Sequence, residues 1–300
     1  MIIDSHIHFW KREMIPNQAV RSYMEPLLKF QEQFGEFLDF GIDKDFAFPD
    51  YHVPMDELLE VLDYSSIDKA VILAVDFELL NDSQMGNEDY TEYLFQECTC
   101  DDRLLPFISV DPNRGEEGLR MIERMVKRYN PQGIKMYPAT GFFPDAEDYD
   151  RYWDLVEDLG LLVVSHAGMA LPPLDEKYCR PSYLRRVAEE HPDMNIIVAH
   201  LGGKFFDELL PLLRSCDNIY TDCSALQGWL PSEPQQVFDR LRKVADEFPD
   251  RMVFGSDFPL YEERFSTLQF INLIREGDWG SDQAKEGLLG TNMARLLGLR

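Results

Sequence analysis

Eight short apolar segments, most of them followed by an amphipathic stretch, predict that the chain folds as a (β/α)8 barrel. The segments are almost continuously apolar, which is typical of parallel strands that are buried on both faces. Their polar residues gather near the carboxyl ends, where a barrel builds its active site. Because barrels of this length fold as one unit, we expect a single domain over residues 1–300.

The expected strands leave room for a helix between most neighbours. They are residues 1–9, Lys69–Val75, Leu104–Val110, Gly133–Pro138, Leu161–Gly168, Asn195–Gly202, Asn218–Ala225 and Arg251–Pro259. The clearest expected helices are Met55–Tyr64, Glu116–Tyr129, Tyr149–Leu159, Ser182–Glu190, Phe205–Arg214 and Gln235–Phe248. An open doubly wound sheet is the competing fold, but no glycine-rich phosphate loop follows the first strand.

Two connections are long. Residues 11–54 form an insertion after the first strand that is rich in aromatic residues, Met and Pro, and residues 168–181 form a shorter loop. Loops that follow barrel strands lie on the catalytic face, so we expect the insertion to cover the mouth of the barrel. The aromatic residues of Phe34–Phe40 either pack within the insertion or form a contact in a homodimer.

The composition excludes several classes of partner. The formal net charge is −26, from 55 acidic and 29 basic residues, so nucleic acid and anionic lipid would be repelled. No apolar run approaches the ~20 residues of a membrane helix. The first ten residues lack the basic head and apolar stretch of a secretory leader. The five cysteines have no zinc-finger spacing and indicate scattered reduced thiols. We therefore expect a cytoplasmic protein with a small-molecule substrate.

Chemically useful side chains lie in or near the ends of most predicted strands. His6 and His8 are alternate residues of the first strand, so their side chains point to the same face. The others are Lys135 in the fourth strand and His166, His200 and Asp257 near the ends of the fifth, sixth and eighth. These positions converge at one mouth in a barrel, where active sites are built, and the paired imidazoles of His6 and His8 form half of a metal site.

Several other polar residues carry weaker signals. Asp222 and Ser224, which end the seventh predicted strand, either line the mouth or cap a turn. Trp10 and Arg180 lie in loops and are candidate substrate contacts. Two histidines, His52 in the insertion and His191 before a proline, are expected at the surface.

Six short motifs follow one another in order along nearly the whole chain. They are Asp4–His8 (DSHIH), Gly133–Pro138 (GIKMYP), Ser165–Gly168 (SHAG), Ala199–Gly203 (AHLGG), Phe254–Pro259 (FGSDFP) and Asn292–Leu299 (NMARLLGL). Through them the chain resembles the metal-dependent amidohydrolase superfamily, specifically the amidohydrolase-related group that includes aminocarboxymuconate semialdehyde decarboxylase. The resemblance implies a barrel and a divalent metal, usually Zn²⁺, with activity on a small acid, amide or lactone-like substrate. We expect one Zn²⁺ ion, with Mn²⁺ as the alternative.

The resemblance also implies roles for individual residues. The metal ligands would be His6, His8, His166 and Asp257. His200 would be the catalytic base or acid, and Asp257 could also accept the proton of a metal-activated water.

Lys135 has two interpretations. In several branches of the superfamily the lysine of the fourth strand is carbamylated and bridges two metals. This sequence, IKMYP, is instead similar to the KLHP variant, for which a single metal is usual. We favour the single metal, with Lys135 free to bind a substrate carboxylate. Tyr137 stands where that variant has histidine, which removes one candidate ligand or base.

Three functional hypotheses follow. The first is hydrolysis of a small amide, ester or lactone. The substrate would be an organic anion that contacts Lys135, Arg180 and Trp10. The second is non-oxidative decarboxylation of a small unsaturated or aromatic acid, which would use the same metal and residues. The third, of a different class, is a non-catalytic barrel that binds a metabolite; a complete ligand set with a base has no structural use and argues against it.

Overall fold

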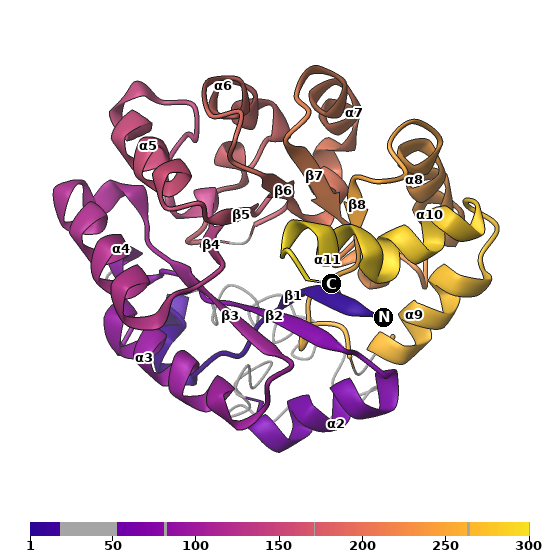
Figure 1. Ribbon diagram of the computed structural model, residues 1–300, viewed down its shortest axis with the longest axis horizontal. Helices are drawn as coiled ribbons and strands as arrows, with labels where there is room; N and C mark the ends of the chain where they lie inside the picture. Colours follow the sequence, from indigo (N-terminus) through magenta and orange to yellow (C-terminus); the bar gives the residue numbers. More distant parts are fainter. Residues whose placement is uncertain (19–52, 81–82, 171, 263–264, 300) are drawn as a thin grey trace, which may run out of the picture.

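Eight parallel strands form one sheet in the order of the sequence, β1 to β8, in the computed structural model (Figure 1). The structure describes residues 1–18, 53–80, 83–170, 172–262 and 265–299. The strands are β1 (Ile3–Ile7), β2 (Lys69–Leu73), β3 (Leu104–Ser109), β4 (Gly133–Met136), β5 (Leu162–Ser165), β6 (Ile196–Val198), β7 (Ile219–Asp222) and β8 (Met252–Val253). Their sequential order confirms the predicted barrel and excludes the doubly wound sheet.

The sheet closes because β1 pairs with the segment around the end of β8. A parallel bridge joins Ile7 to Phe258. The backbone N–H of Ser5 donates to the Phe254 carbonyl and that of His8 to the Phe258 carbonyl, each at 2.8 Å. The two ends of the strand order therefore meet, and residues near their carboxyl ends share one mouth.

Helices surround the strands (Figure 1). They are α2 (Met55–Ser65), α3 (Asn87–Glu97), α4 (Glu116–Tyr129), α5 (Asp150–Asp158), α6 (Leu184–Glu190), α7 (Phe206–Ser215), α8 (Pro234–Glu247), α9 (Thr267–Glu276), α10 (Asp282–Glu286) and α11 (Asn292–Leu296). All the helices expected from the sequence are confirmed, with ends that shift by at most two residues. Within the described ranges, no helix is long and apolar enough to cross a membrane.

The apolar residues form an inner and an outer core. Strand residues such as Ile3, Val71, Val164 and Val253 pack with α11 inside the ring, whereas their neighbours along each strand pack outward against the helices. The carbonyl of Leu297 accepts a hydrogen bond from Gln132, which precedes β4. Helix α11 therefore lies at the amino-terminal end of the barrel, opposite the mouth.

The register of β1 shifts between Asp4 and Ile7. Ile3 packs in the inner core and Ile7 in the outer core, although residues four apart in a regular strand share one face. At the shift, one Asp4 carboxylate oxygen accepts hydrogen bonds from the backbone N–H groups of His6 and Ser256, each at 3.0 Å. The irregularity turns His6 and His8 towards the interior.

The structure tests the expectations for His191 and the cysteines but not those for the insertion. The insertion 11–54 lies mostly outside the described residues, as do His52 and Phe34–Phe40, so its position over the mouth stays a prediction. His191 was expected at the surface, and this is wrong, because its side chain is buried. Its Nδ1 lies 3.0 Å from a carboxylate oxygen of Glu157, which reaches it from α5. All five cysteines are free, as predicted.

A glycine in β4 makes room for the inner core. A Cβ atom at Gly133 would lie 2.1 Å from the Phe107 ring and 2.4 Å from the carbonyl oxygen of Leu162. Phe107 therefore fills the space that a side chain at position 133 would take. Because the carbonyl belongs to the neighbouring strand, the clash cannot be relieved by a change of side-chain rotamer.

We predict that Gly133→Ala lowers the free energy of unfolding by about 3 kcal/mol, because overpacking here displaces both a buried ring and a strand. Urea titration followed by circular dichroism measures the change. Gly280→Ala is the matched control, since its Cβ would make contacts of 3.5 Å with Ala245 and Ala284. Equal stability of the two variants would contradict the packing argument.

Candidate metal centre

Two histidines of β1 present ring nitrogens to one carboxylate. Nε2 of His6 and Nε2 of His8 each lie 3.5 Å from the same Asp257 oxygen, and all three side chains are buried. Nδ1 of His8 lies 3.1 Å from the Leu73 carbonyl, which can only accept, so this nitrogen carries the proton. Nε2 of His8 therefore offers a lone pair.

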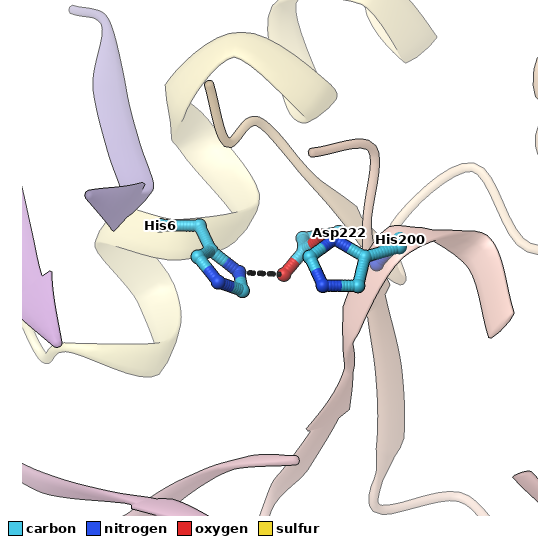
Figure 2. Close-up of side chains that lie close together, drawn as sticks. All are labelled: His6, His200 and Asp222. Atoms are coloured by element: carbon cyan, nitrogen blue, oxygen red, sulfur yellow. Dashed lines mark hydrogen bonds and ion pairs between the residues drawn. The ribbon is translucent and has the colours of Figure 1, made fainter. Parts of the chain in front are cut away.

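A second carboxylate fixes the other histidine. Nδ1 of His6 lies 2.8 Å from an Asp222 oxygen, and Figure 2 shows this carboxylate facing the His6 ring with His200 beside it. Donation from Nδ1 to the carboxylate leaves the lone pair of His6 on Nε2, towards Asp257. Both imidazoles thus aim a lone pair at one point beside the Asp257 carboxylate.

Lys135 projects from β4 into this cluster. Its ammonium lies 3.1 Å from Nε2 of His6, and the side chain is fully buried. Burial lowers the pKa of Lys135, and the charges of Asp222 and Asp257 oppose that shift. Burial raises the pKa of Asp257, with Lys135 acting in the opposite direction. The site holds one cation close to its two carboxylates.

His166 and His200 form a second pair. Nδ1 of His166 lies 3.1 Å from Nε2 of His200, and Nε2 of His166 lies 3.1 Å from the Met169 carbonyl. His200 stands next to His6, with 4.9 Å between their ring centroids. The structure therefore gathers four predicted histidines at one mouth, but His166 contacts His200 and is not in the group formed by His6, His8 and Asp257.

Asp222 and Ser224 are part of the site. The sequence left open whether they line the mouth or cap a turn. One Asp222 oxygen accepts hydrogen bonds from the backbone N–H of His200 at 2.7 Å and of Ser224 at 3.0 Å, and from the Ser224 hydroxyl. The Ser224 hydroxyl also lies 2.7 Å from Nδ1 of His200. The signal that could have found them is their position at the end of β7, on the same edge as the other site residues.

Two groups of three side chains could hold a metal ion among the described residues. One is His6, His8 and Asp257, and the other is His6, His200 and Asp222. In the second group the Asp222 carboxylate is already the acceptor for one ring and two backbone N–H groups. The first group is the better ligand set, because the lone pairs of both Nε2 atoms face its carboxylate; the one on His6 also lies 3.1 Å from the Lys135 ammonium.

Two site residues have left-handed backbones. The φ angles are 60° at His200 and 57° at Asp257, a conformation that costs about 1–3 kcal/mol for a residue with a side chain. Tertiary hydrogen bonds hold both. The His200 N–H donates to Asp222 at 2.7 Å, and the Asp257 N–H donates to the His6 carbonyl at 2.8 Å. Such strain is typical of functional sites.

Burial keeps the imidazoles neutral. It lowers the pKa values of His6, His8 and His200 well below their ordinary value, and that of His166 to about 3, with nearby cationic groups adding to the effect. Burial also raises the pKa of Asp4 to about 7. A neutral imidazole is the form that ligates a metal.

Aromatic rings lie on two of the histidines. Trp10 stacks on His8 with 4.5 Å between ring centroids, and Tyr137 lies 4.4 Å from His166. Arg180, the other loop residue predicted to contact substrate, pairs with Glu208 of α7 and lies 5.0 Å from the centroid of the Phe205 ring. Its side chain is partly exposed, and its role stays a prediction.

Comparisons with solved structures agree on the fold. A 5-carboxyvanillate decarboxylase from Sphingomonas paucimobilis is 12% identical with a TM-score of 0.69, covering 100% of this chain and 99% of its own. A probable 2-pyrone-4,6-dicarboxylic acid hydrolase from Acinetobacter baumannii is 16% identical with a TM-score of 0.64, covering 99% of both chains. An amidohydrolase from Burkholderia multivorans with bound zinc is 17% identical with a TM-score of 0.67, covering 100% of both.

No curated protein sequence matches the chain significantly. The amidohydrolase family model, however, matches residues 3–299, which is nearly the whole chain. The match spans β1 with its two histidines, the strand ends that carry Lys135 and Asp257, and the closing helix α11. The chain belongs to the amidohydrolase family.

Proposed function

We propose that this protein is a metal-dependent hydrolase of a small organic anion, in which an amide, ester or lactone bond is cleaved. The observation that carries the proposal is the convergence of two ring lone pairs, from His6 and His8, on the Asp257 carboxylate at the barrel mouth. The family membership supports an enzyme with this chemistry. Product analysis decides which reaction the protein catalyses.

The donor set fits one divalent ion, most simply Zn²⁺, with Mn²⁺ as the alternative. Ligand atoms around a tetrahedral zinc lie ~3.3 Å apart, which follows from bond lengths of ~2.0–2.1 Å. The two Nε2 atoms each lie 3.5 Å from the Asp257 oxygen. His166 is the proposed fourth ligand, because its neutral ring contacts His200, which stands next to His6. The zinc in the Burkholderia multivorans amidohydrolase supports the choice of ion.

Each polar residue then has a proposed task. A bound divalent ion would polarise a carbonyl group and lower the pKa of a coordinated water to roughly 7. His200, whose ring is neutral and held by Ser224, would transfer a proton to the leaving group or accept one. Asp257 is placed to accept a proton beside the ion, because its carboxylate oxygen lies 3.5 Å from Nε2 of both His6 and His8. Lys135 would pair with a substrate carboxylate.

Decarboxylation of a small unsaturated or aromatic acid is the alternative. The ring of Trp10, which stacks on His8, and that of Tyr137, which lies tilted against His166, favour a flat substrate. The structural similarity to a 5-carboxyvanillate decarboxylase supports this second reaction as much as the similarity to a pyrone dicarboxylate hydrolase supports the first. Both reactions would use the same metal, Lys135 and His200.

We predict one equivalent of divalent metal in protein purified without chelator, and turnover that chelation abolishes and Zn²⁺ or Mn²⁺ restores. Metal analysis and a panel of lactones, N-acyl amino acids and hydroxybenzoates measure this, with acid release and carbon dioxide scored separately. His200→Ala should retain the metal and lose at least about 100-fold in kcat, because it removes the proton-transfer group.

The panel separates the three hypotheses. Carbon dioxide without a hydrolytic product would replace the hydrolase by the decarboxylase. Metal-free protein with full turnover would overturn the metal centre. Binding of a panel compound without turnover, equal in wild type and His200→Ala, would instead favour a non-catalytic barrel.

We predict that Lys135→Met raises KM for an anionic substrate by about tenfold or more, because a charge-assisted hydrogen bond contributes ~1.5–3 kcal/mol. Steady-state kinetics on the best panel substrate measure the change. Arg180→Met is the comparison, and we expect a smaller increase because Arg180 already pairs with Glu208. Loss of bound metal from Lys135→Met would instead indicate a carbamylated lysine that bridges two ions.

We predict a pH signature of His166 in the metal-free protein. Its pKa of about 3 lies below the ordinary value of 6.5, so the unfolded state binds one proton more between these values. The His166 contribution to stability is therefore complete above pH 6.5 and decreases as the pH falls towards 3.

Between pH 4 and 6, the free energy of unfolding of wild type should fall more steeply than that of His166→Asn. The slopes should differ by about 1.4 kcal/mol per pH unit, the value for one proton. Urea unfolding in the presence of a chelator measures both proteins. Above pH 7.5 the difference should be constant, which is the internal control; parallel curves at every pH would contradict a buried neutral His166.

A further inference from the structure

We propose that Gln227 is a positioning residue that holds Asp257, a candidate metal ligand, in its left-handed backbone conformation. The inference rests on the proposed metal centre, because it concerns the carboxylate that Nε2 of His6 and Nε2 of His8 face. It follows from one buried hydrogen bond between the loop after β7 and the segment after β8.

Gln227 is a buried amide that joins these two segments. It lies in the one-turn 3-10 helix Leu226–Gly228, which follows β7, and its exposed fraction is 2%. Its Nε2 donates a hydrogen bond of 2.7 Å to the Ser256 carbonyl. A carbonyl can only accept, so the amide nitrogen and not the amide oxygen faces it. Within the described ranges, the buried Oε1 has no hydrogen-bond partner.

The unpaired oxygen indicates that packing alone does not explain this residue. An apolar side chain of the same size would avoid burying an oxygen without a partner, which is costly. The two segments also pack closely without the amide, since a Cβ atom at Gly228 would lie 2.8 Å from the Tyr261 ring. What Gln227 adds to this contact is the hydrogen bond to Ser256.

That hydrogen bond acts on the peptide group between Ser256 and Asp257. A peptide group is planar, so its carbonyl and its N–H turn together. Gln227 holds the carbonyl, and the N–H of Asp257 donates to the His6 carbonyl at 2.8 Å. The peptide plane is therefore held at both of its polar groups, which fixes its rotation and with it the φ angle of Asp257.

The bonds of the neighbouring groups do not replace this one. The Ser256 N–H donates to an Asp4 oxygen at 3.0 Å, and the Asp257 carbonyl accepts from the Leu260 N–H at 3.1 Å. These bonds hold the preceding and the following peptide groups. Gln227 holds the carbonyl that lies between them.

The rotation of this peptide plane affects the position of the carboxylate. A φ angle of 57° is unfavourable for a residue with a Cβ atom. Without the Gln227 donor, the buried carbonyl loses its partner and the plane is free to turn about the remaining bond to His6, which relaxes φ. The Cα–Cβ bond of Asp257 then changes direction, and a metal site tolerates ligand displacements of only ~0.5 Å.

Gln227→Met removes the donor at nearly constant volume, and two measurements on the full chain test its effect. Competition with a chromophoric chelator gives the Zn²⁺ affinity, which should fall about 10–100-fold, as is typical when an indirect partner of a ligand is lost. Hydrogen exchange in the metal-free protein, followed by nuclear magnetic resonance, should be about tenfold faster at the Asp257 amide. The His200 amide, which donates to Asp222, should keep its exchange rate.

Asn87→Leu is the matched control. Asn87 is a buried amide at the start of α3 whose Nδ2 donates to the Ser109 carbonyl at 2.7 Å, and its Oδ1 has no hydrogen-bond partner in the described part of the chain. Both variants lose a hydrogen bond of the same kind, so both should be less stable in urea. Only Gln227→Met should change the Zn²⁺ affinity and the exchange of the Asp257 amide.

An unchanged Zn²⁺ affinity or an unchanged Asp257 exchange rate in Gln227→Met would overturn the proposal, as would equal effects in Asn87→Leu. If Gln227→Met does not fold, the wild type decides, because its Gln227 side-chain amide should be protected from exchange and rapid exchange would refute the bond. Wild type that binds no Zn²⁺ would overturn the metal centre, whereas Asp257 exchange in the metal-free protein would still test the positioning role.

Discussion

The pairing of β1 with the segment at the end of β8 is the constraint on which the site depends. It joins the first residues of the chain to residues about 250 positions later through backbone hydrogen bonds, among them Ser5 to Phe254 and His8 to Phe258. Without this closure, His6 and His8 would lie on an open edge of the sheet, far from Asp257. The same bonds bring the Asp257 N–H to the His6 carbonyl, so the closure also fixes the orientation of a candidate ligand.

A single buried carboxylate organises the rest of the mouth. Asp222 bonds the His6 ring of β1, the His200 backbone after β6 and Ser224 after β7. A buried carboxylate is costly unless it is hydrogen-bonded, and here each bond also holds a group that needs positioning. The left-handed backbone of His200 persists because this bond offsets its strain. The fold and the site therefore both depend on the hydrogen bonds of Asp222. The apolar inner core at the amino-terminal end of the barrel supports the site rigidly.

Much of the fold was predictable because it depends on local patterns. Continuous apolar segments and amphipathic stretches identified the strands and helices, since parallel strands are buried on both faces and helices on one. The alternation of His6 and His8 predicted a shared face, and the strand order then placed Lys135, His166, His200 and Asp257 at the same end. The pattern failed for His191, which is buried and contacts Glu157 of α5.

The sequence by itself determined the architecture and most of the residues at the mouth, because strand periodicity and the rule for barrel ends need no distant partner. The tertiary structure alone decided how these residues interact. It decided the register shift in β1 through the bond from Ser256 to Asp4, the pairing of Asp222 with His6, and the contact between His166 and His200. These partners lie between 34 and 252 residues apart in the sequence. Hydrogen-bond geometry between such groups depends on the closed barrel, which no local pattern specifies.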